Sequence, residues 1–135
     1  MRHEANDLWS QAKAELDDAV AIFGVRRWAK VCFSCEMAVQ MALKAMIVER
    51  TGKPHPKIHK LRELGRLAGC PGSLTLHLDL LDPYYMETRY PDVGGKIPAL
   101  LFTEQQARPA FDAAVPILSW AAKELGTDEP KSRLP

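Results

Sequence analysis

The residues with the clearest chemical potential lie in one short segment, residues 84–92, which combines three tyrosines with an arginine and acidic residues. A guanidinium group binds phosphate in bidentate fashion, and aromatic rings accept bases or cations on their faces. Core packing alone does not require this mixture, which suits an anionic or aromatic ligand. The candidate binding residues are Tyr85, Arg89, Tyr90 and Asp92.

The same segment also fits a structural corner between a helix and a loop. In that interpretation the tyrosine hydroxyl groups bond to backbone groups. Arg89 then forms an ion pair with Asp92 or Glu87. The residue types by themselves leave both interpretations open.

Three further polar residues are candidates for a site. Glu36 and Lys44 lie in one run of helical composition, a little over two turns apart, so they share roughly one face. Lys44 can bind a phosphate group as a point charge, although both residues also fit a solvated helix surface. His59 stands at the start of another predicted helix, where free backbone N–H groups favour anions. It is a candidate ligand contact or, alternatively, a capping residue.

Cys32 and Cys35 have the spacing of a redox or zinc half-site. They fall inside a continuous helical run, and neither Cys70 nor the dispersed histidines complete a set of four ligands at a usual spacing. We therefore expect small cysteines buried in the core. We expect neither a metal nor another cofactor.

The whole chain has the composition of one globular domain. Its 135 residues are 47% hydrophobic and 26% charged, and a chain of this length can form a core without disulfides or metals. The net charge is only +1, so any contact with nucleic acid must be local. We expect a cytoplasmic protein without a membrane segment. The chain has three cysteines, no apolar window of roughly 18 residues and no signal-peptide pattern.

Helical periodicity predicts an all-α protein of about five helices. Asn6 is a candidate cap for the first helix, and Gly24 can close it in the left-handed conformation. A capping box of Thr103 and Gln106 opens the last helix. The expected helices cover residues 7–23, 26–50, 58–68, 74–87 and about 103–125.

The segments between these helices are short. Residues 88–102 are predicted as a loop, and residues 126–135 as a flexible tail that follows a domain over 1–125. Helices joined by short connections predict an up-and-down antiparallel bundle.

Four motifs occur in order along nearly the whole chain. The first helix contains Trp9, and residues 32–45 contain an aromatic and small residues followed by an Ala-rich run with Glu and Lys. Residues 59–64 read His-x-Leu-x-x-Leu, and residues 85–92 read Tyr-x-x-x-Arg-Tyr-Pro-Asp. Together they resemble the HEPN family, the nucleotide-binding domain of higher eukaryotes and prokaryotes. The resemblance implies a helical bundle that pairs as a homodimer, association with nucleotide or RNA, and frequent pairing with a small nucleotidyltransferase.

Some members of that family are metal-independent RNases with an Arg-x(4–6)-His motif, in which histidine transfers protons and arginine stabilises the charged transition state. Arg50 and His55 match this motif formally and are candidate catalytic residues. The pair spans a helix end and a proline, and it lies earlier in the chain than the resemblance implies. No histidine follows His77, so Arg89 has none downstream.

The sequence thus favours a nucleotide-associated interaction module that acts with a nucleotidyltransferase-type partner, in a toxin–antitoxin-like or stress-response pair. Two alternatives remain at this point. One is an RNase that uses Arg50 and His55, or Arg89 with a histidine brought in by the fold. The other is a purely structural helical dimer.

Overall fold

The second long helix, α2, forms the centre of the molecule. The computed structural model describes Met1 to Pro135, with Gly94 described only as part of its helix. In it α2 runs from Trp28 to Thr51 and ends at Gly52, which has the left-handed conformation predicted for a helix-ending glycine. Most side chains of α2 are buried, because helices pack on several of its sides.

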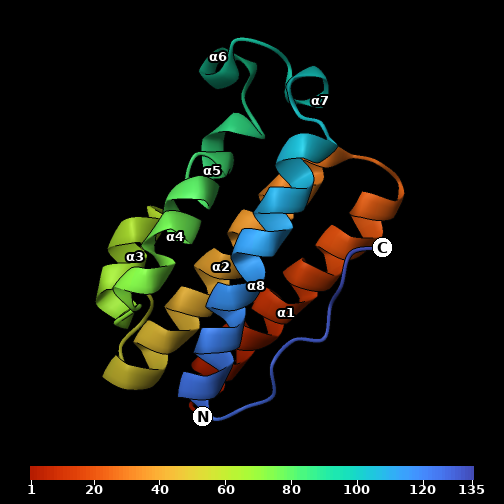
Figure 1. The fold of residues 1–135 in the computed structure, drawn as a ribbon. Coiled ribbons are helices and arrows are strands. Elements are labelled where there is room, and N and C mark those ends of the chain that lie inside the picture. The colour runs from red at the N-terminus through yellow and green to blue at the C-terminus, as the bar shows by residue number, and fades with distance from the viewer.

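Two other long helices, α1 (His3–Gly24) and α8 (Glu104–Leu125), pack along α2 (Figure 1). The predicted capping box opens α8: the Thr103 side chain accepts from a backbone N–H of the first turn, and the Gln106 side chain accepts from the Thr103 N–H at 2.8 Å. The buried stripe of α1 repeats every three or four residues, as expected for an amphipathic helix. It consists of Ala5, Trp9, Ala12, Leu16, Ala19 and Phe23.

The two ends of α1 differ from the prediction. The helix begins at His3, so Asn6 lies inside it and does not cap it. At the other end Gly24 is still helical, and Arg26 takes the left-handed conformation with a φ of 63°. The backbone N–H groups of Arg26 and Arg27 donate back to the last turn of α1, which is the pattern of a Schellman motif.

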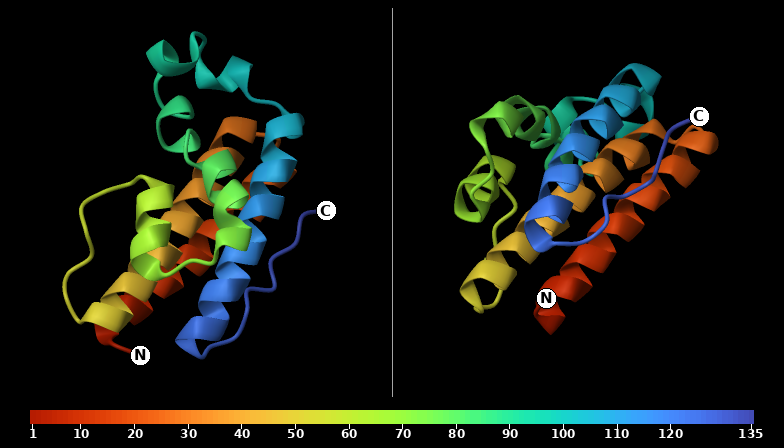
Figure 2. Two further views of the ribbon diagram at one scale, coloured as in Figure 1. Left: turned by 60° about the vertical axis from the view of Figure 1, so that its left-hand side comes forward. Right: turned by 60° about the horizontal axis from the view of Figure 1, so that its bottom comes forward.

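The helix predicted over residues 74–87 is divided at Pro83, since proline has no N–H to continue the ladder. Its parts are two short helices, α4 (Thr75–Leu81) and α5 (Tyr84–Glu87), and a 3₁₀ turn, η1 (Gly72–Leu74), precedes them. Helix α3 (Leu61–Ala68) packs against α2 and α4. Figure 2 shows α3 and α4 on one side of α2 and α1 on the other.

The segment predicted as a loop, residues 88–102, contains two single-turn helices at one end of the bundle (Figure 1). They are α6 (Pro91–Gly94) and α7 (Pro98–Leu101). Each begins at a proline, whose fixed φ suits the first helical position and whose missing N–H would be unpaired there in any case.

The fold class is confirmed: within the described residues the elements are all helices, and they form a bundle. Residues 126–135 form no helix and run back beside α8 and α1 (Figure 1). Ser132 Oγ donates to Asp17 of α1 at 2.5 Å, and Leu134 packs against the core. The flexibility expected of this tail stays a prediction.

One helix, α2, has the length and mean hydropathy of a membrane span, although Glu36 and Lys44 interrupt its apolar run. In this structure 83% of its most apolar stretch is buried inside the bundle. Its apolar side chains are therefore already used in packing against the other helices.

Candidate functional site

A ladder of three polar side chains lies on one face of α2. Glu36, Gln40 and Lys44 are spaced four residues apart, so they stand one above the other along the helix. The Gln40 amide donates to the Glu36 carboxyl group at 3.0 Å, and Lys44 Nζ donates to the Gln40 oxygen at 3.0 Å. All three are buried, with Glu36 0% and Lys44 6% exposed. The interpretation of Glu36 and Lys44 as solvated surface charges is therefore wrong.

Burial changes the acid–base behaviour of this ladder. Loss of hydration raises the pKa of Glu36 to about 8, and the nearby Asp82 carboxylate acts in the same direction. The Gln40 hydrogen bond and the positive charges of Arg89 and Lys44 lower that pKa, but they do not cancel the effect of burial. Burial also lowers the pKa of Lys44, and the charge of Lys57 adds to this shift. At neutral pH, Glu36 thus retains its proton in most molecules.

A second group of side chains lies beside the ladder and forms what we call the arginine–aromatic cluster: Phe33, His59, Tyr85 and Arg89. The guanidinium carbon of Arg89 lies 4.1 Å from the centre of the Tyr85 ring and 4.8 Å from that of Phe33. The His59 ring stacks on Tyr85, with centroids 3.9 Å apart and planes 16° apart. The cluster therefore brings together the end of α5, the second turn of α2 and the segment before α3.

Arg89 has no ion pair within the described part of the chain, although two acids are close in sequence. The structural-corner interpretation expected an ion pair of Arg89 with Glu87 or Asp92. Neither acid forms this pair. The Nε atom of Arg89 is buried and has no hydrogen-bond partner. A buried, unpaired N–H group is costly, and a phosphate or carboxylate oxygen is the acceptor that a guanidinium group binds best.

A hydrogen bond between distant segments holds the cluster in position. The Asp82 carboxylate, at the break between α4 and α5, accepts from the backbone N–H of Leu61 at 2.8 Å. This bond caps the first turn of α3 and joins it to the chain just before α5. His59 precedes Leu61 by two residues, and Tyr85 follows Asp82 by three, so the bond fixes both rings relative to each other.

The predicted ligand-binding residues divide into two groups. The structure brings Tyr85, Arg89 and His59 together, whereas Lys44 belongs to the polar ladder, in which Glu36 senses the charge of Arg89. Tyr90 and Asp92 lie outside this group. Tyr90 is 45% exposed at the start of α6, and Asp92 is exposed in its first turn.

Arg50 and His55, the candidate catalytic pair, have other partners. Arg50 donates to the backbone carbonyl of Ala68 at the end of α3, and it forms an ion pair of 3.4 Å with Glu124 of α8. A ring nitrogen of His55 lies 3.2 Å from the carbonyl oxygen of its neighbour Pro56. Arg50 thus joins helix ends, and none of these contacts links it to His55.

Sequence reasoning missed the contributions of Phe33, Gln40 and Asp82. The role of Gln40 could have been predicted from the sequence, because a polar residue midway between Glu36 and Lys44 completes a ladder of four-residue steps. Phe33 lies one turn before Glu36 on the same side of α2 and follows the same rule. Asp82 gives no such signal, since its partner is the backbone of a segment far away in sequence.

The cysteines behave as predicted core residues. Cys32 and Cys35 are fully buried, and burial raises the pKa of Cys32 to about 12 and that of Cys35 further still. Such thiols are poor nucleophiles and poor metal ligands. In the described part of the chain, no group of three or more His, Cys, Asp or Glu side chains could hold a metal ion.

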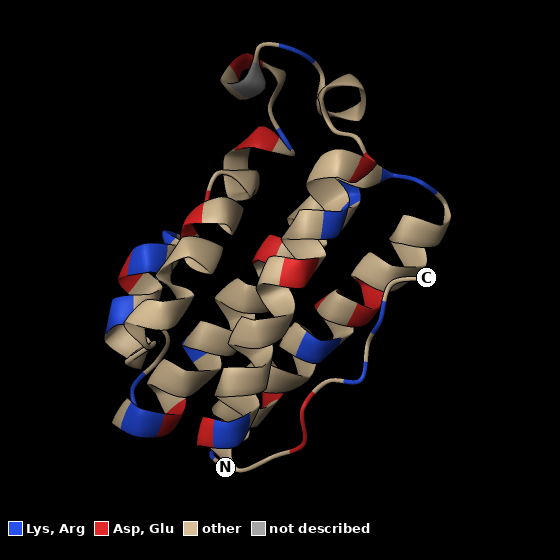
Figure 3. Cartoon of the chain, in the orientation of Figure 1, with Lys and Arg blue, Asp and Glu red and all other residues tan. Residues whose placement is uncertain are grey.

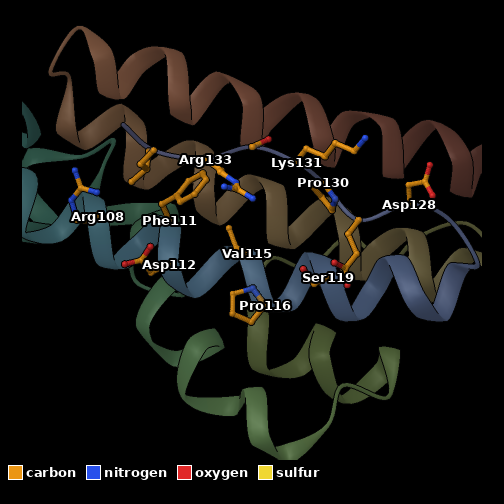
Figure 4. A pocket seen from close by; sticks show the side chains of 13 residues that line it. Arg108, Phe111, Asp112, Val115, Pro116, Ser119, Asp128, Pro130, Lys131 and Arg133 are labelled. Carbon is orange, nitrogen blue, oxygen red and sulfur yellow. The ribbon is translucent and has the colours of Figure 1, made fainter.

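Another cavity lies away from the cluster, and none of the cluster residues lines it. It encloses about 1000 Å³ between α8 and the C-terminal tail. Figure 4 shows Arg108 and Asp112 on its α8 side and Lys131 and Arg133 on its tail side. Its lining mixes both signs of charge, which gives no preference for an anion or a cation. The cluster of Arg89 is the stronger candidate site on chemical grounds.

Residues 5–125 match the HEPN domain family. This chain belongs to that family. Two solved structures share the fold of this HEPN protein. TT1696 from Thermus thermophilus is 30% identical, with a TM-score of 0.81 over 91% of this chain and 99% of that chain. ST0689, an archaeal HEPN homologue, is 24% identical, with a TM-score of 0.76 over 92% of this chain and 99% of that chain. Among curated proteins, none matches this sequence.

Proposed function

We propose that this HEPN protein binds a nucleotide at the arginine–aromatic cluster. The observation that carries the proposal is Arg89, which packs against two aromatic rings and has no acidic partner among the described residues. A phosphate oxygen would satisfy its unpaired N–H group, and the His59 ring, which stacks on Tyr85 with one face, offers its other face for a base. Lys44, at the far end of the polar ladder, carries a second positive charge on the same face of α2.

The test is equilibrium binding of labelled ATP to the purified protein. Arg89→Ala should weaken binding by about tenfold or more, which is the expected loss of a charge-assisted hydrogen bond. Arg62→Ala is the matched control, because Arg62 is an exposed arginine on α3 that already pairs with Asp79 at 2.7 Å. If Arg89→Ala and Arg62→Ala bind ATP equally well, the site is assigned wrongly.

We further propose that the protein acts with a nucleotidyltransferase-type partner in a toxin–antitoxin-like or stress-response pair, in the cytoplasm. Family membership supports the pairing through the resemblance described above, and three free cysteines fit a reducing compartment. Co-expression with the product of the neighbouring gene tests the pairing. A stable complex that retains nucleotide is the expected result, and separate elution of the two proteins would contradict it.

A homodimer is part of this proposal. Helix α4 presents Leu76, 81% exposed, and Leu80, 38% exposed, on one side of the bundle. They are four residues apart and thus neighbours on the helix surface. An apolar pair of this kind suits contact with a second copy across a two-fold axis, where the same residues meet from both sides.

An RNase activity is the second candidate function, and one contact favours it. His59 stacks on the ring that Arg89 also contacts, so the fold supplies a histidine near that arginine. In this alternative His59 transfers a proton and Arg89 stabilises the charged phosphate. It predicts cleavage of structured RNA without added metal and loss of cleavage in His59→Ala. Unchanged cleavage in that variant would exclude this pair.

A further inference from the structure

A small cavity at the turn between α1 and α2 has a strongly basic lining. It encloses about 260 Å³ and is bounded by the start of α2, by Thr88 at the end of α5 and by the first turn of α7. Three cations line it, and the described lining includes no acidic residue. The lining residues are Arg26, Arg27, Trp28, Ala29, Lys30, Thr88, Pro98 and Ala99.

The positive charge of this cavity is not neutralised locally. None of Arg26, Arg27 and Lys30 forms an ion pair within the part of the chain that the structure describes. Figure 3 shows the turn between α1 and α2 as a basic stretch. The whole chain carries a net charge of only +1, so these three cations are a local concentration that attracts an anion to this end of the bundle.

Aromatic rings alternate with these cations. The Trp28 ring is held edge-on by Phe23 at 4.9 Å, and the Arg26 guanidinium lies 5.7 Å from it. The Phe33 ring has Lys30 Nζ at 5.9 Å and the Arg89 guanidinium at 4.8 Å. Phe33 therefore links the cavity to the arginine–aromatic cluster. Phe33 follows Trp28 by five residues along α2, which corresponds to a rise of about 7.5 Å along the helix axis.

Arg26 occupies its place at a conformational cost. It is the one non-glycine residue with a positive φ among those described, at a position where helices usually have glycine. A residue with a side chain is strained in this conformation. The strain is consistent with a use for the Arg26 side chain outside the turn itself.

We propose that this cavity is a second phosphate-binding site, which holds a further phosphate group of the ligand bound at Arg89. The inference rests on the proposed function. The volume of the cavity is smaller than that of typical sites for whole ligands. It suits one or two phosphate groups of the ligand, with an aromatic ring of the ligand placed over Trp28. Such groups occur in the polyphosphate of a free nucleotide and in the backbone of an oligoribonucleotide.

The test compares AMP, ATP and a single-stranded hexa-adenylate as ligands of the full-length protein. Arg26→Gly removes a cation and relieves the backbone strain, so its melting temperature should equal or exceed that of the wild type. The Arg26→Gly variant should bind ATP, hexa-adenylate or both about tenfold more weakly than the wild type, while its affinity for AMP stays within twofold. Lys30→Gln, on the helix itself, is a second variant with the same expected effect. Arg66→Ala, an exposed cation on α3, is the control for net charge.

The ligand source follows from which probe is affected. A loss confined to ATP indicates a free nucleotide, and a loss confined to hexa-adenylate indicates an RNA backbone. The proposal is overturned if both cavity variants bind ATP and hexa-adenylate as Arg66→Ala does, or if the wild type binds neither.

Inorganic tripolyphosphate separates this inference from the proposed function. If it binds in an Arg26-dependent manner while Arg89→Ala leaves ATP binding unchanged, the cavity is a phosphate site and the Arg89 assignment fails. If ATP binding depends on Arg89 but not on Arg26 or Lys30, the Arg89 assignment holds and the cavity proposal fails.

Discussion

The guanidinium carbon of Arg89 lies 4.1 Å from the centre of the Tyr85 ring, and the two side chains come from the same turn of chain at the end of α5. The ring shields one side of the cation from water, and Phe33 shields another at 4.8 Å. Partial desolvation strengthens the attraction of a cation for an anion, because the effective dielectric constant falls. This contact is therefore the basis of the nucleotide site that we propose.

The Tyr85 ring, rather than its hydroxyl group, should support this site. Tyr85→Phe keeps the ring and should leave the dissociation constant for ATP within about twofold of the wild type. Tyr85→Leu removes the cation–π contact and should weaken ATP binding by roughly threefold to thirtyfold. Calorimetric titration of both variants provides the measurement. Equal affinities for the two variants would show that the ring contact does not matter.

The raised pKa of Glu36 predicts a dependence of stability on pH. The folded-state pKa of about 8 lies above the ordinary value of 4.5, so folding favours the protonated acid. The free energy of unfolding should therefore fall as pH rises between about 4.5 and about 8, by an amount on the order of a few kcal/mol at most. Urea denaturation at a series of pH values measures this fall.

Glu36→Gln is the matched variant for that experiment, because glutamine keeps the shape and still accepts the hydrogen bond from Gln40. It should lose this part of the pH dependence and be more stable than the wild type at pH 8. A variant whose stability follows the same pH curve as the wild type would mean that Glu36 is ionised in the folded protein.

Arg50 should act on stability and not on ligand binding. Arg50→Ala removes the contacts with Ala68 and Glu124, and we expect the free energy of unfolding to fall by about 1 kcal/mol. ATP affinity should be unchanged, and His55→Ala should alter neither property measurably. Loss of an RNA-cleaving activity in both variants would instead restore this pair as catalytic residues.

The exposed leucines of α4 should determine the oligomeric state. Leu76→Glu should convert a homodimer to a monomer in size-exclusion chromatography with light scattering, because two buried carboxylates would face each other across the two-fold axis. Leu100→Glu is the control, since Leu100 is 74% exposed and belongs to α7, away from the leucine pair of α4. A monomeric wild type, or a Leu76→Glu variant that stays dimeric, would refute this interface.

The local signals of the sequence predict the helix ends well where one residue type determines the conformation. The Thr103 capping box begins α8 as expected, and Gly52 and Gly69 end α2 and α3 in the left-handed conformation that favours glycine. The turn at Arg26 escapes such rules, because a left-handed arginine goes against the usual preference for glycine. Pro83 marks a disturbance inside the predicted helix 74–87, but whether it bends or divides the helix depends on packing.

The candidate site is predictable only in part. Tyr85 and Arg89 are close in sequence, so their proximity follows from one helical turn. The burial of Glu36 and Lys44 does not, since a polar ladder with this spacing looks the same on a solvated face. Spacing along α2 places Phe33 on the face of Glu36, but its contact with Arg89 depends on α5 packing over α2, which is a long-range contact.

The most direct test of the central claim is an NMR titration of the Arg89 side chain with ATP. The Nε–H group of Arg89 is buried without an acceptor, so its resonance should shift strongly when a phosphate oxygen binds. Arg89→Ala identifies the signal by its absence. We predict a saturating shift of this resonance, with smaller shifts for residues 33–44 of α2. ATP binding that leaves the Arg89 resonance unmoved would contradict the account.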